Sequence, residues 1–256
     1  MNWSCALINL PRITDRTLVD YAQSIGFRDI EFCPRHNPEG TEDVIEYALS
    51  KGFQISIHAH HGPNNIIDTN LENRKRSREQ IKYCIDLSKR YHLGVVTFHP
   101  GRLSTEEESE EEKWVQLLEA VEEIAAYAKE QQVYVALENM ELRKYELVYT
   151  LEDLNRFAYI GKDNPYFGVT LDFAHFSSHG IYEPDLSQLK LPVLNIHLSQ
   201  CIDGIMHKTL AGEGGAVHVP EVCKLLHDYG YTGRIIFEMG NGYEDSLEIL
   251  RNIKIM

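Results

Sequence analysis

Cysteine is scarce in this sequence: there are five among 256 residues, and no two of them form a Cys-x-x-Cys pair. An odd number of dispersed cysteines argues against a disulfide framework and is typical of a reduced intracellular protein. Long hydrophobic runs are also missing, although a membrane-spanning helix needs about 18 consecutive apolar residues. The first residues contain neither a basic segment nor a long apolar core, so no signal peptide is predicted. We therefore expect a cytoplasmic protein with no membrane partner.

Basic residues are in deficit, with 25 Lys and Arg against 39 Asp and Glu, for a formal net charge of −14. Six of the negative charges lie in Glu106–Glu112, and removing those six from −14 leaves about −8 for the rest of the chain. Proteins that bind nucleic acid usually carry a basic surface, so the charge argues against a nucleic-acid partner without excluding one. No Gly-x-Gly-x-x-Gly sequence follows the first expected strand, so we expect no nucleotide cofactor.

Eight short apolar segments alternate with helical patterns along the chain. The expected strands are Ser4–Asn9, Phe27–Phe32, Phe53–His60, Gly94–His99, Val133–Leu137, Gly168–Leu171, Val193–Ile196 and Arg234–Phe237. A helical pattern lies between each pair, although it is poor between Asp172 and Val193. Alternating strands and helices indicate an α/β protein with a parallel sheet, and a count of eight favours a (β/α)8 TIM barrel over a doubly wound sheet. We expect a single domain over residues 1–256.

Ionisable residues stand where these strands end. They are Glu31, His58, His99, Glu138, Asp172, His197 and Glu238. A carboxylate or imidazole at the end of a buried strand costs free energy unless something pairs with it. In a parallel barrel all strand C-termini open onto the same mouth, where reactive groups collect. We therefore predict that these side chains converge on a divalent metal ion.

Four of these residues come from consecutive strands, the fifth to the eighth: Glu138, Asp172, His197 and Glu238. Three carboxylates and one imidazole suit Zn²⁺, Mn²⁺, Mg²⁺ or Co²⁺. His58 and His99 could form a second, zinc-like site that shares Glu138.

Each of these positions also has an ordinary structural interpretation. A strand-end Asp commonly caps the following helix, and a strand-end His is often simply hydrogen-bonded in the core. Glu31 is interpreted as a salt bridge at the barrel rim.

The ordered motifs carry a resemblance. They are His58-Ala59, His99-Pro100-Gly101, Glu138-Asn139, Asp172-x-x-His175, His197-Leu198, Gly212-Glu213-Gly214 and, at the last strand, Glu238. Together they resemble the xylose isomerase-like TIM barrel superfamily, which includes sugar isomerases, sugar epimerases and the endonuclease IV family. The resemblance covers nearly the whole chain. It implies that the four residues on strands five to eight bind the metal, that the two glutamates among them also move the proton, and that His175 contacts substrate oxygens.

The resemblance to the sugar-converting members predicts a metal-dependent isomerase or epimerase of a sugar, sugar phosphate or cyclitol. A metal bound to a carbonyl and the neighbouring hydroxyl would stabilise the enediolate that forms when the C–H proton leaves. One of Glu138 and Glu238 would take the proton, and the other would return one. The predicted substrate-binding residues are His175, His207, His60 and Arg102. The predicted partner is therefore a small sugar or sugar-like molecule.

A zinc phosphodiesterase that resembles endonuclease IV and acts on abasic DNA is the alternative. His58, His99 and the pair His175 and His207 indicate it. In that family the segment that carries the residue matched by His207 also supplies an Asp two residues earlier, and here that position is Ile205, although Asp203 is close by. A non-catalytic barrel that keeps its metal for structure or sensing is a third interpretation.

One basic segment, Asn73–Arg78, follows the third strand on the mouth side, and Arg102 follows the fourth. They could form a phosphate subsite for a sugar phosphate or a nucleic-acid backbone. The segment could equally be the solvated start of a helix.

Overall fold

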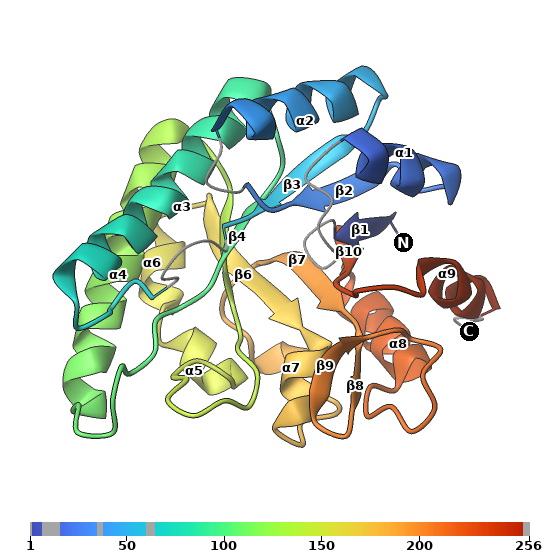
Figure 1. Ribbon diagram of the computed structural model, residues 1–256. Coiled ribbons are helices and arrows are strands. Elements are labelled where there is room, and N and C mark those ends of the chain that lie inside the picture. The colour runs from blue at the N-terminus through green and yellow to red at the C-terminus, as the bar shows by residue number, and fades with distance from the viewer. Residues whose placement is uncertain (1, 7–15, 35–37, 60–64, 253–256) are drawn as a thin grey trace.

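Eight parallel strands close into a barrel in the computed structural model, which describes residues 2–6, 16–34, 38–59 and 65–252 (Figure 1). Hydrogen bonds join the strands in the order β1-β2-β3-β4-β5-β6-β7-β10 and back to β1. The strands are β1 (Asn2–Ala6), β2 (Asp29–Phe32), β3 (Gln54–His58), β4 (Val96–Phe98), β5 (Val135–Glu138), β6 (Phe167–Asp172), β7 (Val193–Leu198) and β10 (Arg234–Phe237). The predicted (β/α)8 TIM barrel is therefore confirmed.

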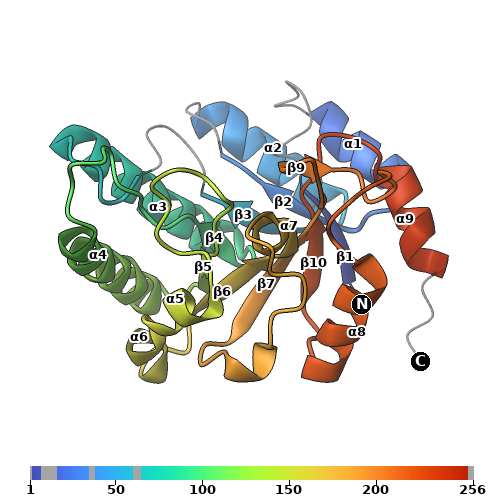
Figure 2. The same ribbon diagram turned by 90° about the horizontal axis from the view of Figure 1, so that it is seen from below.

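Helices surround the strands, and in Figure 2 α4, α3, α2, α1, α9 and α8 form an arc outside the barrel. They are α1 (Arg16–Ser24), α2 (Pro38–Ser50), α3 (Leu71–Tyr91), α4 (Glu110–Gln131), α5 (Leu151–Asn155), α6 (Ala158–Lys162), α7 (Phe173–Ser178), α8 (Val219–Tyr229) and α9 (Tyr243–Asn252). The stretch with a poor helical pattern forms only α7 and a 3-10 turn, Leu186–Gln188. Among the described residues, every helix is too short or too polar to cross a bilayer.

Sequence signals set where several helices begin and end. Thr150 and Asp153 form a capping box at α5: Thr150 Oγ1 accepts the Asp153 N–H at 3.1 Å, and the Asp153 carboxylate accepts the Thr150 N–H at 3.0 Å. Ser109 caps α4, so Glu110–Glu112 fill the first turn, where carboxylates interact favourably with the helix dipole. Gly26 follows α1 with a φ of 99°, a left-handed conformation that glycine adopts without a Cβ clash.

Side-chain alternation along the strands separates a polar interior from an apolar shell. In β3, Ser56 and His58 contact carboxylates of other strands inside the barrel, at Glu31 and Glu138. Ile55 and Ile57 point the other way, because successive strand side chains alternate between faces, and both belong to the buried apolar core. The apolar layer between strands and helices therefore stabilises the barrel while the interior remains available for polar groups.

A β-hairpin that the sequence interpretation missed follows β7. Its strands are β8 (Gln200–Ile202) and β9 (Ile205–Lys208), which pair antiparallel. The hairpin lies beside α7 (Figure 1). Asp203 and Gly204 form its turn with φ values of 51° and 74°, and an Asp-Gly pair between two extended segments is a strong hairpin signal. The signal was therefore present in the sequence.

Candidate metal centre at the barrel mouth

The four predicted quartet residues lie at the same end of the barrel. Glu138 and Asp172 are the last residues of β5 and β6, and His197 is the last but one of β7. Glu238 follows β10 directly. All four are buried, and the most accessible, Glu238, is 6% exposed. The parallel arrangement of the strands brings their C-terminal ends together, so residues from distant parts of the chain meet.

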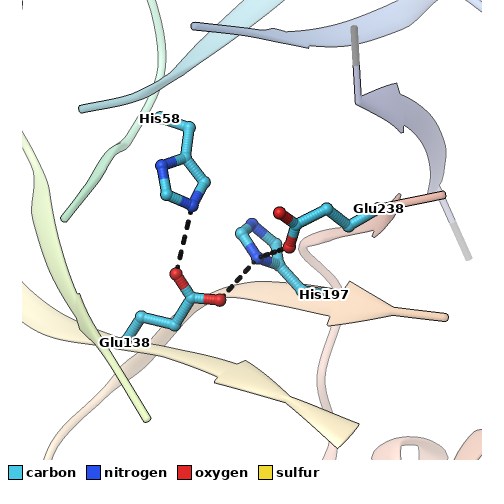
Figure 3. Close-up of side chains that lie close together, drawn as sticks. All are labelled: His58, Glu138, His197 and Glu238. Atoms are coloured by element: carbon cyan, nitrogen blue, oxygen red, sulfur yellow. Dashed lines mark hydrogen bonds and ion pairs between the residues drawn. The ribbon is translucent and has the colours of Figure 1, made fainter. Parts of the chain in front are cut away.

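His197 is at the centre of this group. Its Nδ1 lies 2.8 Å from Glu138 Oε1 and 2.9 Å from Glu238 Oε2. Figure 3 shows that the two carboxylates approach the imidazole from different sides. Strands β6 and β7 separate the two glutamates in the sheet, so they can flank a small ligand.

His58 and His99, the residues predicted for a second metal site, lie against Glu138 of the first site. His58 Nε2 and His99 Nε2 are both 3.2 Å from Glu138 Oε2. The His58 ring stacks on the His197 ring at 5.5 Å between centroids and meets the His99 ring edge to face at 4.9 Å. Glu138 therefore has one oxygen toward His197 and the other toward the two histidines of β3 and β4, as expected of a shared ligand.

Asp172 caps a helix with one carboxylate oxygen and leaves the other available for a metal ion, the two roles predicted for a strand-end aspartate. Its Oδ1 accepts the backbone N–H of His175 at 2.8 Å and so caps α7. Its Oδ2 is buried and accepts no hydrogen bond from the described residues. His175 Nε2 lies 3.8 Å from this oxygen, beyond hydrogen-bond distance. A buried carboxylate oxygen without a donor is what an ion would satisfy.

His175 and His207 come together beside the glutamates. His175 Nδ1 lies 2.7 Å from the carbonyl oxygen of Asn139, and its Nε2 is 3.5 Å from Glu141 Oε2. His207 comes from β9, with Nδ1 3.1 Å from the carbonyl oxygen of Glu238, and its ring lies 5.7 Å from that of His175. His207 has a φ of 61°, which is uncommon for a non-glycine residue and occurs often at functional sites.

Three overlapping sets of side chains have ligand atoms within 4.8 Å of one another. They are His58, Glu138, His197 and Glu238; Glu138, Asp172 and His175; and Asp172, His207 and Glu238. The predicted quartet is thus spread over these sets, with Asp172 joined to the others through the two glutamates. Carboxylates and imidazoles in this density fit a divalent ion such as Zn²⁺ or Mn²⁺.

The electrostatics of the cluster show that it needs positive charge. Burial alone would lower the pKa of His197, but the carboxylates of Glu138, Glu31 and Glu238 raise it well above its usual range. In the same way burial lowers the pKa of His175, but nearby carboxylates, first that of Asp172, raise it to about 9. Burial would raise the pKa of Glu138, yet the charge of His197 holds it well below its usual value. The raised histidine pKa values and the lowered glutamate pKa have one cause, which is that the buried carboxylates stabilise positive charge at this point.

Glu31 does not form a salt bridge at the rim, so that interpretation is wrong. Its side chain is fully buried inside the barrel, with Oε1 2.9 Å from His197 Nε2. The reason is the alternation along β2, which turns Glu31 inward while Ile30 and Phe32 join the apolar core.

The remaining predicted substrate residues lie farther out. Arg102 follows β4 and its guanidinium is 43% exposed, with Nη1 3.8 Å from Glu146 Oε1. His60 falls outside the described residues. The loop after β5 adds two buried carboxylates that the sequence interpretation missed, Glu141 and Glu146. Burial, with the charge of Glu141, raises the pKa of Glu146 to about 7. No sequence signal marks them, because charged residues in a loop usually face water.

The basic segment belongs to the outer wall. It forms the first turns of α3, where Arg78 Nε donates to the carbonyl oxygen of Ile66 at 3.0 Å and Arg78 Nη1 lies 2.8 Å from Glu123 Oε2. Arg74 and Lys75 line a hollow of about 290 Å³ beside α4. The interpretation as a solvated helix start is therefore favoured over a phosphate subsite at the mouth.

Comparisons with known proteins agree with this architecture. The model of a family described as xylose isomerase-like TIM barrel matches residues 19–253. An uncharacterised protein of Methanocaldococcus jannaschii is 22% identical over 93% of this chain and 88% of its own length.

Two solved structures show how far the likeness extends. A D-tagatose 3-epimerase-like protein is 22% identical with a TM-score of 0.84, and the match covers 99% of this chain and 97% of that protein. The 3-keto-D-glucoside 4-epimerase of Escherichia coli is 19% identical with a TM-score of 0.75, over 98% of this chain and 99% of the enzyme. At these identities the likeness establishes the fold.

Proposed function

We propose, since the chain belongs to the xylose isomerase-like TIM barrel family, that it is a metal-dependent isomerase or epimerase of a sugar or sugar-like molecule. The observation that carries the proposal is the placement of Glu138 and Glu238. These two buried carboxylates reach the same imidazole nitrogen, at 2.8 and 2.9 Å, from strands that are not adjacent. From these positions one glutamate would take a proton from one face of a bound substrate, and the other would return one to the opposite face.

Glu138, Asp172, His197 and Glu238 would hold the ion. When bound, a divalent ion would supply a Lewis acid for the carbonyl and hydroxyl oxygens of the substrate. The buried Oδ2 of Asp172, which accepts no hydrogen bond from the described residues, supports this assignment.

We assign Glu138 and Glu238 as the proton carriers. Burial would raise the pKa of Glu238, but the charges of His207 and His197 hold it below its usual value, and the charge of His197 does the same for Glu138. One glutamate, in its ionised form, would remove the proton next to the substrate carbonyl and become protonated. The other would first take up a proton from solvent and then donate it to the resulting enediolate, so that the two exchange protonation states in each turnover.

His175 and His207 would orient the substrate. The Nδ1 of each lies at a backbone carbonyl oxygen, 2.7 Å from Asn139 and 3.1 Å from Glu238 respectively. These contacts fix the two rings, which lie 5.7 Å apart at the edge of the carboxylate cluster. The Nε2 of each ring would then face a substrate hydroxyl, that of His175 from beside the Glu141 carboxylate, 3.5 Å away. Both similar solved structures carry the names of sugar epimerases, which supports a sugar as the substrate.

Exchange of solvent deuterium into candidate ketoses tests the proposal. The protein is loaded separately with Mn²⁺, Co²⁺, Zn²⁺ or Mg²⁺ and incubated with each sugar in D₂O. We expect deuterium at the carbon next to the carbonyl, together with an epimer or isomer, for at least one ketose. Metal binding without exchange into any neutral or phosphorylated sugar would contradict the proposal and leave a non-catalytic barrel.

A zinc phosphodiesterase is the second candidate, because His58 and His99 both contact Glu138 Oε2 at 3.2 Å. That arrangement provides ligands for a second ion, which proton transfer does not require. The hairpin argues the other way: Ile205 is 56% exposed, and Asp203 belongs to none of the three sets found among the described residues. Cleavage of a DNA duplex that contains an abasic site would favour this candidate.

A further inference from the structure

A polar layer fills the barrel interior beneath the metal centre, where bulky aliphatic side chains usually pack. It consists of five side chains that are each at most 1% exposed: Glu31, Ser56, Thr97, Thr170 and Asn195. Thr97 and Thr170 share a hydrogen bond of 2.8 Å, and Asn195 Nδ2 reaches Thr97 Oγ1 at 3.3 Å. A buried carboxylate without compensating donors is costly, so the position of Glu31 within this layer needs a physical reason.

Every oxygen of Glu31 has a defined neighbour. Its Oε2 accepts hydrogen bonds from Ser56 Oγ at 3.1 Å and from Asn195 Nδ2 at 2.9 Å. Its Oε1 lies 2.9 Å from His197 Nε2, close enough for an ion pair but not aligned as a hydrogen bond in this structure. Strand geometry produces this arrangement: Glu31 and Ser56 are register partners in β2 and β3, and Asn195 and His197 are two residues apart on β7, so both point inward.

The two ring nitrogens of His197 therefore face different carboxylates. Nε2 faces Glu31, whereas Nδ1 faces Glu138 and Glu238. These nitrogens point away from opposite edges of the imidazole, so Glu31 does not share an ion with Nδ1. Glu31 is also a member of none of the three sets of ligand atoms among the described residues.

We propose that Glu31 is a positioning residue: when the metal is bound, its Oε1, which already lies 2.9 Å from His197 Nε2, accepts the Nε2–H and thereby directs the Nδ1 lone pair at the metal. Asn195 and Ser56 hold the carboxylate in place for this purpose. A carboxylate behind a ligating histidine fixes its tautomer and ring orientation and increases its basicity. The inference rests on the metal centre of the proposed function and adds a requirement within the barrel core that the ligands alone do not reveal.

Glu31→Gln tests this directly, because the amide has nearly the same shape as the carboxylate. If the amide NH₂ of this variant faced His197, it would donate to Nε2, and the ring proton would have to move to Nδ1. If the NH₂ faced Asn195 instead, two NH₂ donors would face each other with no acceptor between them. We expect zinc affinity, measured by competition with a chromophoric chelator, to fall roughly 10- to 100-fold. Thr170→Val, at the far end of the polar layer, is the matched control and should bind zinc nearly as tightly as the unmodified protein.

Nitrogen-15 NMR of histidine-labelled, zinc-loaded protein provides a readout that a merely structural role would not change. The His197 signal, assigned by its loss in His197→Gln, should show the proton on Nε2 and zinc on Nδ1. A proton on Nδ1 would overturn the inference even if Glu31→Gln does not fold. Tight zinc binding that is insensitive to Glu31→Gln would overturn the inference alone, whereas failure of the unmodified protein to bind any divalent ion would overturn the proposed function as well.

Discussion

Oppositely charged side chains meet in two contrasting regions of this molecule. On the outer wall, Glu123 of α4 pairs with Arg78 and Lys82 of α3 at 2.8 and 2.6 Å, and the glutamate is 41% exposed. At the mouth, Glu138 contacts His58 and His197 at similar distances but is fully buried. An exposed pair contributes about 0–1 kcal/mol, whereas removal of one partner from a buried pair costs about 3–5 kcal/mol.

The two regions differ in the balance of their charges as well as in their exposure to solvent. At the wall, two cations and water surround one carboxylate. At the mouth and just beneath it, four carboxylates are buried together, those of Glu31, Glu138, Asp172 and Glu238, and their main partners are histidines. Buried negative charge at this density is tolerated where protons or a metal ion neutralise it. The mouth therefore has the charge distribution of a site that binds a cation.

The largest expected effect comes from Glu238→Gln, which keeps the shape of the mouth and removes one proton carrier. Loss of a positioned acid or base typically lowers a rate about 10²- to 10⁴-fold, and we expect a loss of this size in deuterium exchange into the substrate. Glu248→Gln on the exposed side of α9 is the control. An unchanged exchange rate in Glu238→Gln would contradict the assigned role.

Metal binding should stabilise the fold substantially. An ion present at about 1,000 times its dissociation constant adds about 4 kcal/mol to the free energy of unfolding, because it binds the folded state alone. We expect Zn²⁺ or Mn²⁺ to raise the melting temperature of chelator-treated protein. Glu138→Gln should lose most of this gain, since Glu138 contributes to two of the three ligand sets. An equal gain in that variant would place the ion elsewhere.

Glu146 should make stability depend on pH in an unusual direction. Folding raises its pKa from 4.5 to about 7, so the folded state binds this proton more tightly than the unfolded state does. The contribution therefore favours folding at low pH and is lost as the pH rises through about 7, with a full size of about 3 kcal/mol.

Glu146→Gln removes this dependence because the amide does not ionise. Its advantage in urea denaturation should grow as the pH rises from about 4.5 to about 7. Glu152→Gln on the exposed side of α5 is the control. A variant less stable than the parent at high pH would indicate that the Glu146 carboxylate is stabilised there by Arg102 rather than penalised by burial.

The smallest effect is expected at the outer wall. Glu123→Gln breaks the contacts to both Arg78 and Lys82, yet it should cost about 1 kcal/mol or less. Because salt screens exposed charges, the difference should shrink further when the denaturation is repeated at high ionic strength. A cost as large as that of a buried pair would remove the contrast drawn between the two regions.

The sequence was sufficient for the parts of this structure that obey local rules. The eight strands, the capping box at Thr150 and the position of Glu138, Asp172, His197 and Glu238 at one end of the barrel follow from periodicity and from the common direction of parallel strands. The role of each residue in chemistry stays a prediction.

Other features depend on contacts that no local pattern encodes. A strand-end glutamate usually faces water, which is why a rim position is predicted for Glu31. Its burial depends instead on hydrogen-bond donors from β3 and β7. The burial of Glu146 likewise depends on how the loop after β5 folds back beside Arg102.

The β8–β9 hairpin is independent of the barrel register. It leaves the barrel after β7 and returns before α8, so its length can change without shifting the register of any barrel strand. His207 is carried on this hairpin, whereas Glu138 ends β5 and Glu238 follows β10. A change in the hairpin can therefore remove the His207 ring from the carboxylate cluster while the barrel holds the two glutamates in place.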